Sequence, residues 1–361
     1  MRGLREHPGA RPALRIGALF VGDRSHEFDA FARGEVPTHR LLGVAELARR
    51  GHDIHFVRRR RSATRVIPYS VRWRLYQACW VFRRQRAIDV FIATHEAAAL
   101  PALVLRRIGL LRRPVLVMTV AATGDRYRSG KWGGVKRWAL RGADVLTVFS
   151  SAQRALLADM LGVPEERVQF LPLGVDVDFS SPLERLRDAG IVAVGTNEGK
   201  DYPTLIRALP DGVACTIVTD EWNRNAGLAL ADGKDVTFLS DVHISRLREL
   251  YATAQVVVIP LSEVDISSGQ TVLLENLAMN TPIVVSDVSH IRDYARRDVV
   301  RLVPAADVDA MAMAAALHDV MTASTRHCEA GRSFVSAGFT ARNMGESLDG
   351  LAQSMVQRRL S

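Results

Sequence analysis

The chain alternates between short β-branched runs and helical segments, and it does so in two successive series. The first series opens with the run Arg15–Val21 and the second with Ile191–Val194, and a turn-rich passage over residues 173–182 separates them. Such alternation predicts mainly parallel sheets with helices on both faces. Open α/β sheets bind ligands beyond the carboxyl ends of their strands. The sequence therefore predicts an α/β protein of two doubly wound, Rossmann-like domains that face each other across a cleft.

The length of 361 residues suits two domains of roughly 150–180 residues each. We place the N-terminal domain at residues 1–176 and the C-terminal domain at 177–345. A final helix follows at 346–361, and a return of this helix to the N-terminal domain is one option. Further predicted strands are Asp53–Val57, Asp89–Ala93, Val115–Thr119, Asp144–Phe149, Cys215–Thr219, Val236–Leu239, Val256–Pro260 and Ile283–Ser286. Predicted helices include Thr38–Arg50, Tyr202–Leu209, Ile244–Ala254, Thr271–Met279 and Ala341–Arg359, and one that Ser150 and Gln153 start as a capping box and Gly162 ends.

Basic residues gather in the first part of the chain. Residues 1–145 carry 29 Lys/Arg against 11 Asp/Glu, whereas the remainder carries 19 against 28. This division predicts that the N-terminal domain faces an anionic partner or surface. Within Val71–Arg86, Trp and Tyr alternate with arginines, which suits peripheral contact with an anionic membrane; a core helix with a solvated basic face is an equal alternative. We find no groove-reading motif and expect no nucleic-acid partner.

The sequence also bears on where the chain resides. Its three cysteines are far apart and form no C-x-x-C pair, which favours free thiols in a reducing compartment. No apolar run approaches the ~20 residues that span a bilayer, and the short run after the N-terminal arginines lacks a signal-peptide cleavage site. We expect a soluble, cytoplasmic protein, with peripheral attachment to the inner face of the cell membrane as an option.

The segment 256–287 carries the clearest sign of a binding site. A buried strand runs into a loop with Ser267, Ser268 and Gly269, and a helix follows at once. The start of such a helix presents unpaired backbone N–H groups, which bind anions such as phosphate. At 100° per residue, Ser268, Thr271 and Glu275 fall on one stripe. We therefore expect a phosphate at the helix start and Glu275 on the hydroxyls of a ribose.

This segment resembles the donor-site signature of glycosyltransferases with the GT-B fold, and most of all the retaining family 4. The residues that carry the likeness are Leu-Leu-Glu-Asn-Leu-Ala-Met-Asn-Thr-Pro-Ile-Val-Val-Ser-Asp at 273–287, with support from 142–150, 161–176, 192–209 and 250–260. The resemblance implies transfer of a hexosyl or related group from a UDP or GDP sugar, with retention and without a metal or other cofactor. The acceptor would be a glycan, a lipid-linked molecule or a small molecule.

The resemblance also implies roles for individual residues. Ser267 stands where the family has a glutamate, so that role passes to Asp265 or Glu263 or is absent, and Thr196 stands where the family has an arginine, which leaves Lys200 for the diphosphate. The histidine that the family has after the strand at 115–119 is missing, so His39, His95 and Asp125 become candidates for contacts with sugar or acceptor. We assign donor binding to Gly195, Asn197, Lys200, Ser267, Ser268, Gly269, Gln270, Thr271 and Glu275, and catalysis to Asp265, His95 and Asp125.

Two other interpretations stay open at this point. One is a nucleotide-sugar epimerase on the same fold, which would need acid and base groups that face the sugar. The other is a non-catalytic protein that binds anions or membranes through its basic half.

Overall fold

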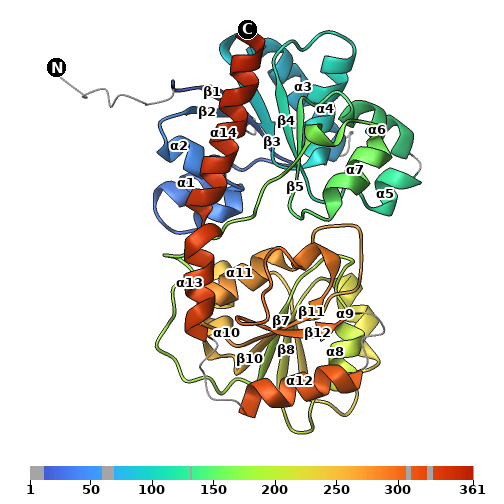
Figure 1. The fold of residues 1–361 in the computed structure, drawn as a ribbon, viewed down its shortest axis with the longest axis vertical. Helices are drawn as coiled ribbons and strands as arrows, with labels where there is room; N and C mark the ends of the chain where they lie inside the picture. The colour runs from blue at the N-terminus through green and yellow to red at the C-terminus, as the bar shows by residue number, and fades with distance from the viewer. Residues whose placement is uncertain (1–11, 59–68, 131, 306–309, 323–327, 361) are drawn as a thin grey trace, which may run out of the picture.

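The structure, a computed structural model, describes residues 12–58, 69–130, 132–305, 310–322 and 328–360. Two α/β domains lie one above the other in Figure 1, and each is built on a six-stranded sheet. All strand pairs in both sheets are parallel. The predicted fold class, two doubly wound domains of the GT-B type, is confirmed.

The N-terminal sheet has the strand order β2-β1-β3-β4-β5-β6. Its strands alternate in sequence with helices, which cover both of its faces. The strands are β1 (Arg15–Leu19), β2 (Asp53–Phe56), β3 (Val90–Ala93), β4 (Val115–Thr119), β5 (Val145–Val148) and β6 (Val168–Phe170). The helices are α1 (Ser25–Ala32), α2 (Val44–Arg49), α3 (Tyr69–Arg84), α4 (Glu96–Arg107), α5 (Asp125–Arg128), α6 (Gly133–Leu140) and α7 (Gln153–Leu161).

The C-terminal sheet has the order β12-β11-β10-β7-β8-β9. Its strands are β7 (Ile191–Val194), β8 (Cys215–Val218), β9 (Val236–Leu239), β10 (Val256–Ile259), β11 (Ile283–Asp287) and β12 (Arg301–Pro304). The helices that follow β6 in the sequence are α8 (Tyr202–Ala208), α9 (Glu221–Leu228), α10 (Ile244–Thr253), α11 (Gln270–Ala278), α12 (Ala310–Thr322), α13 (Cys328–Gly338) and α14 (Ala341–Leu360).

The strand order of the C-terminal sheet reverses between β7 and β10. Val256 of β10 pairs with Ile191 of β7, so the two strands end at the same level. Ligands of doubly wound sheets bind at such a switch point, beyond the carboxyl ends of the strands. The loops that follow β7 and β10, together with the first turns of α11, hold all the residues to which the sequence assigns donor binding, and the fold therefore brings them together.

The chain crosses between the domains twice, and the two crossings lie side by side. Val175 forms a parallel bridge with Thr340: Val175 N donates to Phe339 O at 2.9 Å, and Ala341 N donates to Val175 O at 2.8 Å. A Cβ atom on Gly174 would lie 2.1 Å from Thr340 O, so this close approach requires glycine.

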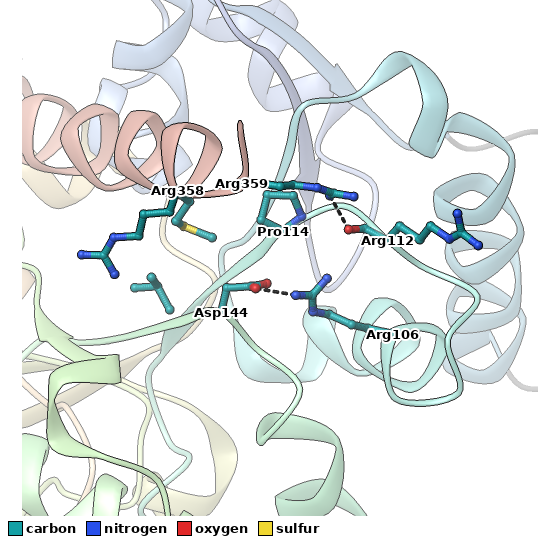
Figure 2. A pocket seen from close by; sticks show the side chains of 8 residues that line it. Arg106, Arg112, Pro114, Asp144, Arg358 and Arg359 are labelled. Atoms are coloured by element: carbon teal, nitrogen blue, oxygen red, sulfur yellow. Dashed lines mark hydrogen bonds and ion pairs between the residues drawn. The ribbon is translucent and has the colours of Figure 1, made fainter. Parts of the chain in front are cut away.

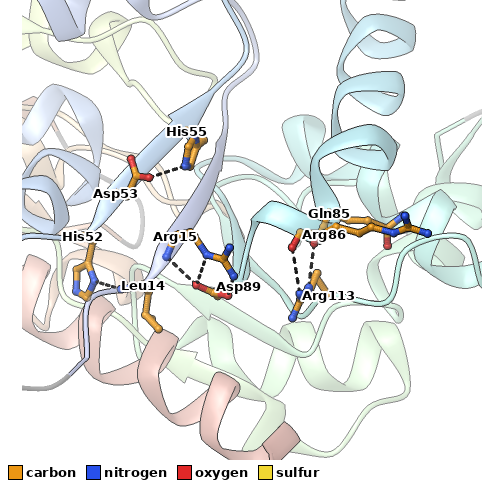
Figure 3. Close-up of polar contacts among 9 residues, drawn as sticks. All are labelled: Leu14, Arg15, His52, Asp53, His55, Gln85, Arg86, Asp89 and Arg113. Atoms are coloured by element: carbon orange, nitrogen blue, oxygen red, sulfur yellow. Dashed lines mark hydrogen bonds and ion pairs between the residues drawn. The ribbon is translucent and has the colours of Figure 1, made fainter.

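Helix α14 lies along the N-terminal domain and packs against α2 (Figure 1). A Cβ atom on Gly345 would lie 2.3 Å from Glu46 Cβ, so the two helices are in close contact. His52 fixes the helix further: its Nδ1 accepts from Leu14 N at 3.0 Å, which Figure 3 shows, and its Nε2 lies 3.1 Å from Asp349 Oδ1. The last helix thus belongs by its contacts to the N-terminal domain.

One guanidinium group joins the ends of two helices in the C-terminal domain. Arg187 donates to Tyr251 O and Ala254 O at the end of α10, and to Met279 O and Asn280 O at the end of α11. These carbonyl groups have no partner within their own helices. Arg187 therefore caps both helices and ties the interdomain linker to them.

Two local predictions are wrong. The stretch Thr38–Arg50 is a 3₁₀ turn and a separate helix α2, because Leu42 and Gly43 adopt left-handed backbone angles, with φ of 48° and 78°. The expected capping box at the start of α7 is absent as well: Ser150 Oγ donates to Asp293, and the Gln153 side chain crosses to the other domain. None of the described helices combines the length and the apolar character needed to cross a membrane.

Candidate functional site

A cavity of about 750 Å³ lies between the two domains. From the N-terminal domain it is lined by residues of α3, of the start of α4 and of the loop around α5. From the C-terminal domain it is lined by the loops after β7, β8 and β10. Its lining residues include Arg74, His95, Glu96, Tyr127, Lys136, Asn197, Glu198, Trp222 and Ile266.

Lys200 lies buried in the loop between β7 and α8. Its Nζ has no hydrogen-bond partner among the described residues, and burial lowers its pKa to about 7. Gly195 has a φ of 149°, and a Cβ atom there would lie 2.0 Å from Lys200 Cε, so glycine makes room for the lysine. The ring nitrogens of buried His290 also lack partners in this part of the structure; burial lowers the pKa of His290, and the Lys200 charge lowers it further. Lys200 therefore offers a buried ammonium that no acceptor among the described residues binds.

Asn197 connects the loop after β7 to the loop after β10. Its Oδ1 accepts from Ser268 Oγ at 2.7 Å, and its Nδ2 donates to Ser267 O at 3.3 Å. The hydroxyl of Ser267 instead donates to Gln153 Oε1 of the other domain at 2.9 Å, and the residue is buried. Ser267 thus stabilises the contact between the domains, and Asn197 lines the cavity.

Helix α11 starts directly after this loop. Gly269 has a φ of 84°, and no side chain caps the helix start. The Gln270 side chain donates to His290 O at 2.9 Å and is buried, whereas Thr271 is exposed. The first backbone N–H groups of α11 have no acceptor within the helix, as at any helix start.

Glu275 lies one turn further along α11 and is buried under the N-terminal domain. Its Oε1 lies 2.9 Å from His39 Nε2, and its side chain retains 9% of its surface exposed. His39 Nδ1 accepts from Asp176 N at 3.0 Å, so Nε2 carries the hydrogen and donates to Glu275. The helical period places Thr271 and Glu275 on one stripe, as the sequence indicates. Thr271 is exposed, whereas His39 covers Glu275.

His95 and Glu96 form the opposite wall of the cavity. The carboxylate of Glu96 is fully buried and accepts from Val120 N and Ala121 N, each at 3.0 Å. His95 Nδ1 accepts from Ala97 N and so caps α4, and the His95 side chain remains 34% exposed. Burial, and then the Glu96 charge, raise the pKa of Tyr127 beside them. Sequence reasoning missed Glu96 and Tyr127; the position of Glu96 just after a strand at the switch point was the available signal.

The three residues assigned to catalysis do not gather at one point. Asp265 forms an ion pair with Arg128 and lines a neighbouring cavity of about 480 Å³, whereas His95 lines the larger one. Asp125 starts α5, and its side chain lies outside the described part of the structure. Glu263, the alternative to Asp265, accepts from Ser289 N at 3.0 Å and thereby fixes the 3₁₀ turn after β11.

Comparison with protein families finds two matches that follow one another along the chain. Residues 36–179 match the model described as Glycosyltransferase Family 4, and residues 190–322 match the model described as Glycosyl transferases group 1. Together they cover most of both domains. A search of curated proteins found no match.

Solved structures of similar fold cover nearly the whole chain. A sucrose-phosphate synthase from Thermosynechococcus elongatus is 18% identical, with a TM-score of 0.71 over 95% of this chain and 100% of that one. The Anabaena protein Alr3699/HepE in complex with UDP and glucose is 13% identical, with a TM-score of 0.70 over 94% and 100%. A glycosyltransferase from Rickettsia africae is 13% identical, with a TM-score of 0.64 over 95% and 98%. At these levels of identity, the similarities show that the fold is shared.

Proposed function

Since the chain belongs to the family 4 glycosyltransferases of the GT-B fold, we propose that it transfers a sugar from a UDP or GDP sugar to an acceptor in the interdomain cavity, with retention and without a metal. The donor lies on the C-terminal domain in this proposal. The complexes of HepE with UDP and with UDP-glucose support a nucleotide-sugar donor by analogy. The epimerase gains no support from the comparisons.

The observation that carries the proposal is the buried Lys200 ammonium without a partner. Burial of an uncompensated charge is costly, and a bound anion removes that cost. The diphosphate of a nucleotide sugar would lie between Lys200 and the start of α11, where backbone N–H groups also favour negative charge. These groups would stabilise the charge that develops on the leaving diphosphate, which is the main electrostatic task of the transfer.

In the same proposal Glu275 accepts hydrogen bonds from the ribose hydroxyls. His39 already orients one carboxylate oxygen, since it donates to Oε1. Asn197, which lines the cavity and binds Ser268, would hold the loop after β10 in place against the diphosphate. His95 and Glu96 on the opposite wall would contact the sugar or the acceptor.

The acceptor would approach from the basic N-terminal domain. Helix α3 contributes Arg74 to the cavity, and it also exposes apolar side chains: Leu75 is 60% exposed and Phe82 48%. Exposed apolar groups beside arginines favour contact with an anionic membrane. We include peripheral membrane attachment and a lipid-linked acceptor in the proposal on this ground.

Isothermal titration with UDP and with GDP tests donor binding. One of the two should bind at micromolar concentration, and Lys200→Met should weaken binding at least about tenfold, since a charged hydrogen bond is lost. Arg207→Gln, which removes an exposed charge of α8, is the control and should bind as the wild type does. Wild type that binds neither nucleotide would contradict the proposal.

The products test the chemistry. With the donor identified, proton NMR of the product sugar should show the anomeric configuration of the donor, and EDTA should leave the rate unchanged. An inverted product or a rate abolished by EDTA would contradict these parts of the proposal and leave donor binding intact.

A further inference from the structure

A second pocket lies on the opposite edge of the N-terminal sheet from the cleft. It measures about 410 Å³, and its lining residues are Arg106, Arg112, Pro114, Asp144, Val145, Met355, Arg358 and Arg359 (Figure 2). Pro114 and Asp144 stand just before β4 and β5, whereas the cleft lies beyond the carboxyl ends of these strands. None of the residues that line this pocket lines the interdomain cavity. The end of α14 closes it.

The lining of this pocket is strongly positive, with four arginines and one carboxylate. The Asp144 carboxylate is already engaged: it accepts from the Arg106 side chain and, at 2.8 Å, from Val115 N. Arg106 also donates to Gly142 O and to Arg113 O, each at 2.9 Å. Arg106 and Asp144 therefore form a fixed structural pair, which Figure 2 shows, and this pair leaves Asp144 unavailable to Arg112 and Arg359.

Arg112 and Arg359 form no ion pair with a carboxylate in the described part of the chain. Arg359 donates to the main-chain oxygen of Arg112, so the side chain is aimed across the pocket and away from its own helix. Arg113, which Figure 3 shows bound to Gln85 O and Arg86 O, adds to the charge nearby. Burial lowers the pKa of Arg359, and Arg113 and Arg106 lower it further. Like charges in such an arrangement repel each other unless an anion lies between them.

We propose that this pocket binds a phosphate group, with Arg112 and Arg359 as its main ligands and Arg106, held in place by Asp144, at the bottom of the site. Guanidinium groups match the geometry of phosphate oxygens and bind them in pairs. The same chemistry is offered by the phosphomonoester head group of phosphatidic acid and by a soluble phosphate. Because α14 closes the pocket, a bound phosphate would hold the end of this helix on the N-terminal domain.

Inorganic pyrophosphate is the probe for the soluble source. Hydrogen exchange, followed by mass spectrometry, should slow in peptides that cover residues 108–114 and 352–359 when millimolar pyrophosphate is added. This local readout separates the pocket from the cleft, where pyrophosphate would act on residues 195–200. The double variant Arg112→Gln/Arg359→Gln should need at least about tenfold more pyrophosphate for the same protection.

Flotation with vesicles tests the lipid source. Wild type should float with vesicles of phosphatidylcholine and phosphatidic acid, and less with phosphatidylcholine alone, if the head group is the ligand. The matched control Arg207→Gln/Arg342→Gln removes two exposed arginines outside the pocket and should behave as wild type in both assays. It corrects for the loss of net charge.

If only the pocket variant loses protection by pyrophosphate, or only the pocket variant loses flotation with phosphatidic acid, the proposal is supported. The assay in which the loss occurs identifies the source of the phosphate group. The proposal is overturned if wild type shows neither protection by pyrophosphate nor preference for phosphatidic acid. It is equally overturned if the pocket variant and the control variant respond alike.

Discussion

His39 Nε2 lies 2.9 Å from Glu275 Oε1 and joins two residues that are 236 positions apart in the sequence. His39 is the hydrogen-bond donor of this pair, because its Nδ1 accepts from Asp176 N and its Nε2 therefore carries the hydrogen. The Asp176 carboxylate accepts hydrogen bonds from the main chain of Thr38 and Phe179. Although burial opposes its charge, these hydrogen bonds lower the pKa of Asp176. The N-terminal domain thus orients the carboxylate that we assign to the ribose.

We predict that Glu275→Gln weakens binding of UDP or GDP about tenfold or more. A neutral amide of the same size forms weaker hydrogen bonds to ribose hydroxyls than a carboxylate does, and hydrogen bonds to charged groups contribute about 1.5–3 kcal/mol. Isothermal titration measures the change. The melting temperature should move little, because the amide oxygen still accepts from His39.

The variant His39→Ala tests whether His39 orients Glu275 for nucleotide binding. It leaves the buried carboxylate of Glu275 without its donor, which should cost about 1–3 kcal/mol of folding stability in addition to weaker nucleotide binding. If His39→Ala bound nucleotide as wild type does, the orienting role of His39 would be refuted.

Lys200 should make nucleotide binding depend on pH. Its pKa is lowered to about 7 by burial, so the free protein loses the ammonium as the pH rises above 7. A bound diphosphate favours the ammonium and raises this pKa, so binding between pH 7 and 9 should take up a proton and weaken by up to about tenfold per pH unit. The last phosphate ionisation of UDP, near pH ~6, is complete in this range.

Titration calorimetry in two buffers of different ionisation enthalpy measures the proton uptake. Lys200→Arg keeps the positive charge at all these pH values and should abolish the uptake. A wild type whose affinity is constant from pH 7 to 9 would show that Lys200 does not contact the diphosphate.

Gly174→Ala should destabilise the protein by about 1–3 kcal/mol, because the new methyl group would lie 2.1 Å from Thr340 O and force the paired crossings apart. Urea denaturation measures the effect. The matched control is Gly134→Ala in α6, where a Cβ atom meets nothing within 4 Å and alanine favours the helix. Equal stability of the two variants would contradict the prediction.

Arg187→Met should lower stability by about 2–4 kcal/mol, since it removes the guanidinium that donates to four carbonyl groups at the ends of α10 and α11. Thermal unfolding reports the loss. Arg185→Met, two residues earlier, removes an exposed guanidinium that donates to Glu184 O of its own loop, and this variant should be nearly neutral.

Local sequence patterns predicted the sheets well. The strands Val115–Thr119, Ile191–Val194 and Val236–Leu239 have the bounds that the sequence indicated, because β-branched runs between turn residues determine them locally. The gathering of Gly195, Lys200 and Ser268 at one switch point followed from the same alternation of strands and helices.

The errors arose where distant residues decide the local structure. Thr38–Arg50 has the apolar period of one helix, yet His39 binds Glu275 of the other domain and the backbone turns at Leu42. Ser150 and Gln153 have the spacing of a capping box, yet their partners are Asp293 and Ser267. Such long-range contacts leave no periodic signal in a single sequence.

The pairing of Val175 with Thr340 has a geometric consequence for substrate exchange. Both covalent links between the halves of the molecule run through this one flank, so a separation of the halves is confined to a swing about it. The rim near α5, where Thr123 and Arg128 meet Asp265, lies away from α13 and α14 in Figure 1 and would travel furthest. In the function that we propose, sugar nucleotides would enter and leave at this rim, where a few side-chain contacts join the domains, while the flank with the two links stays closed.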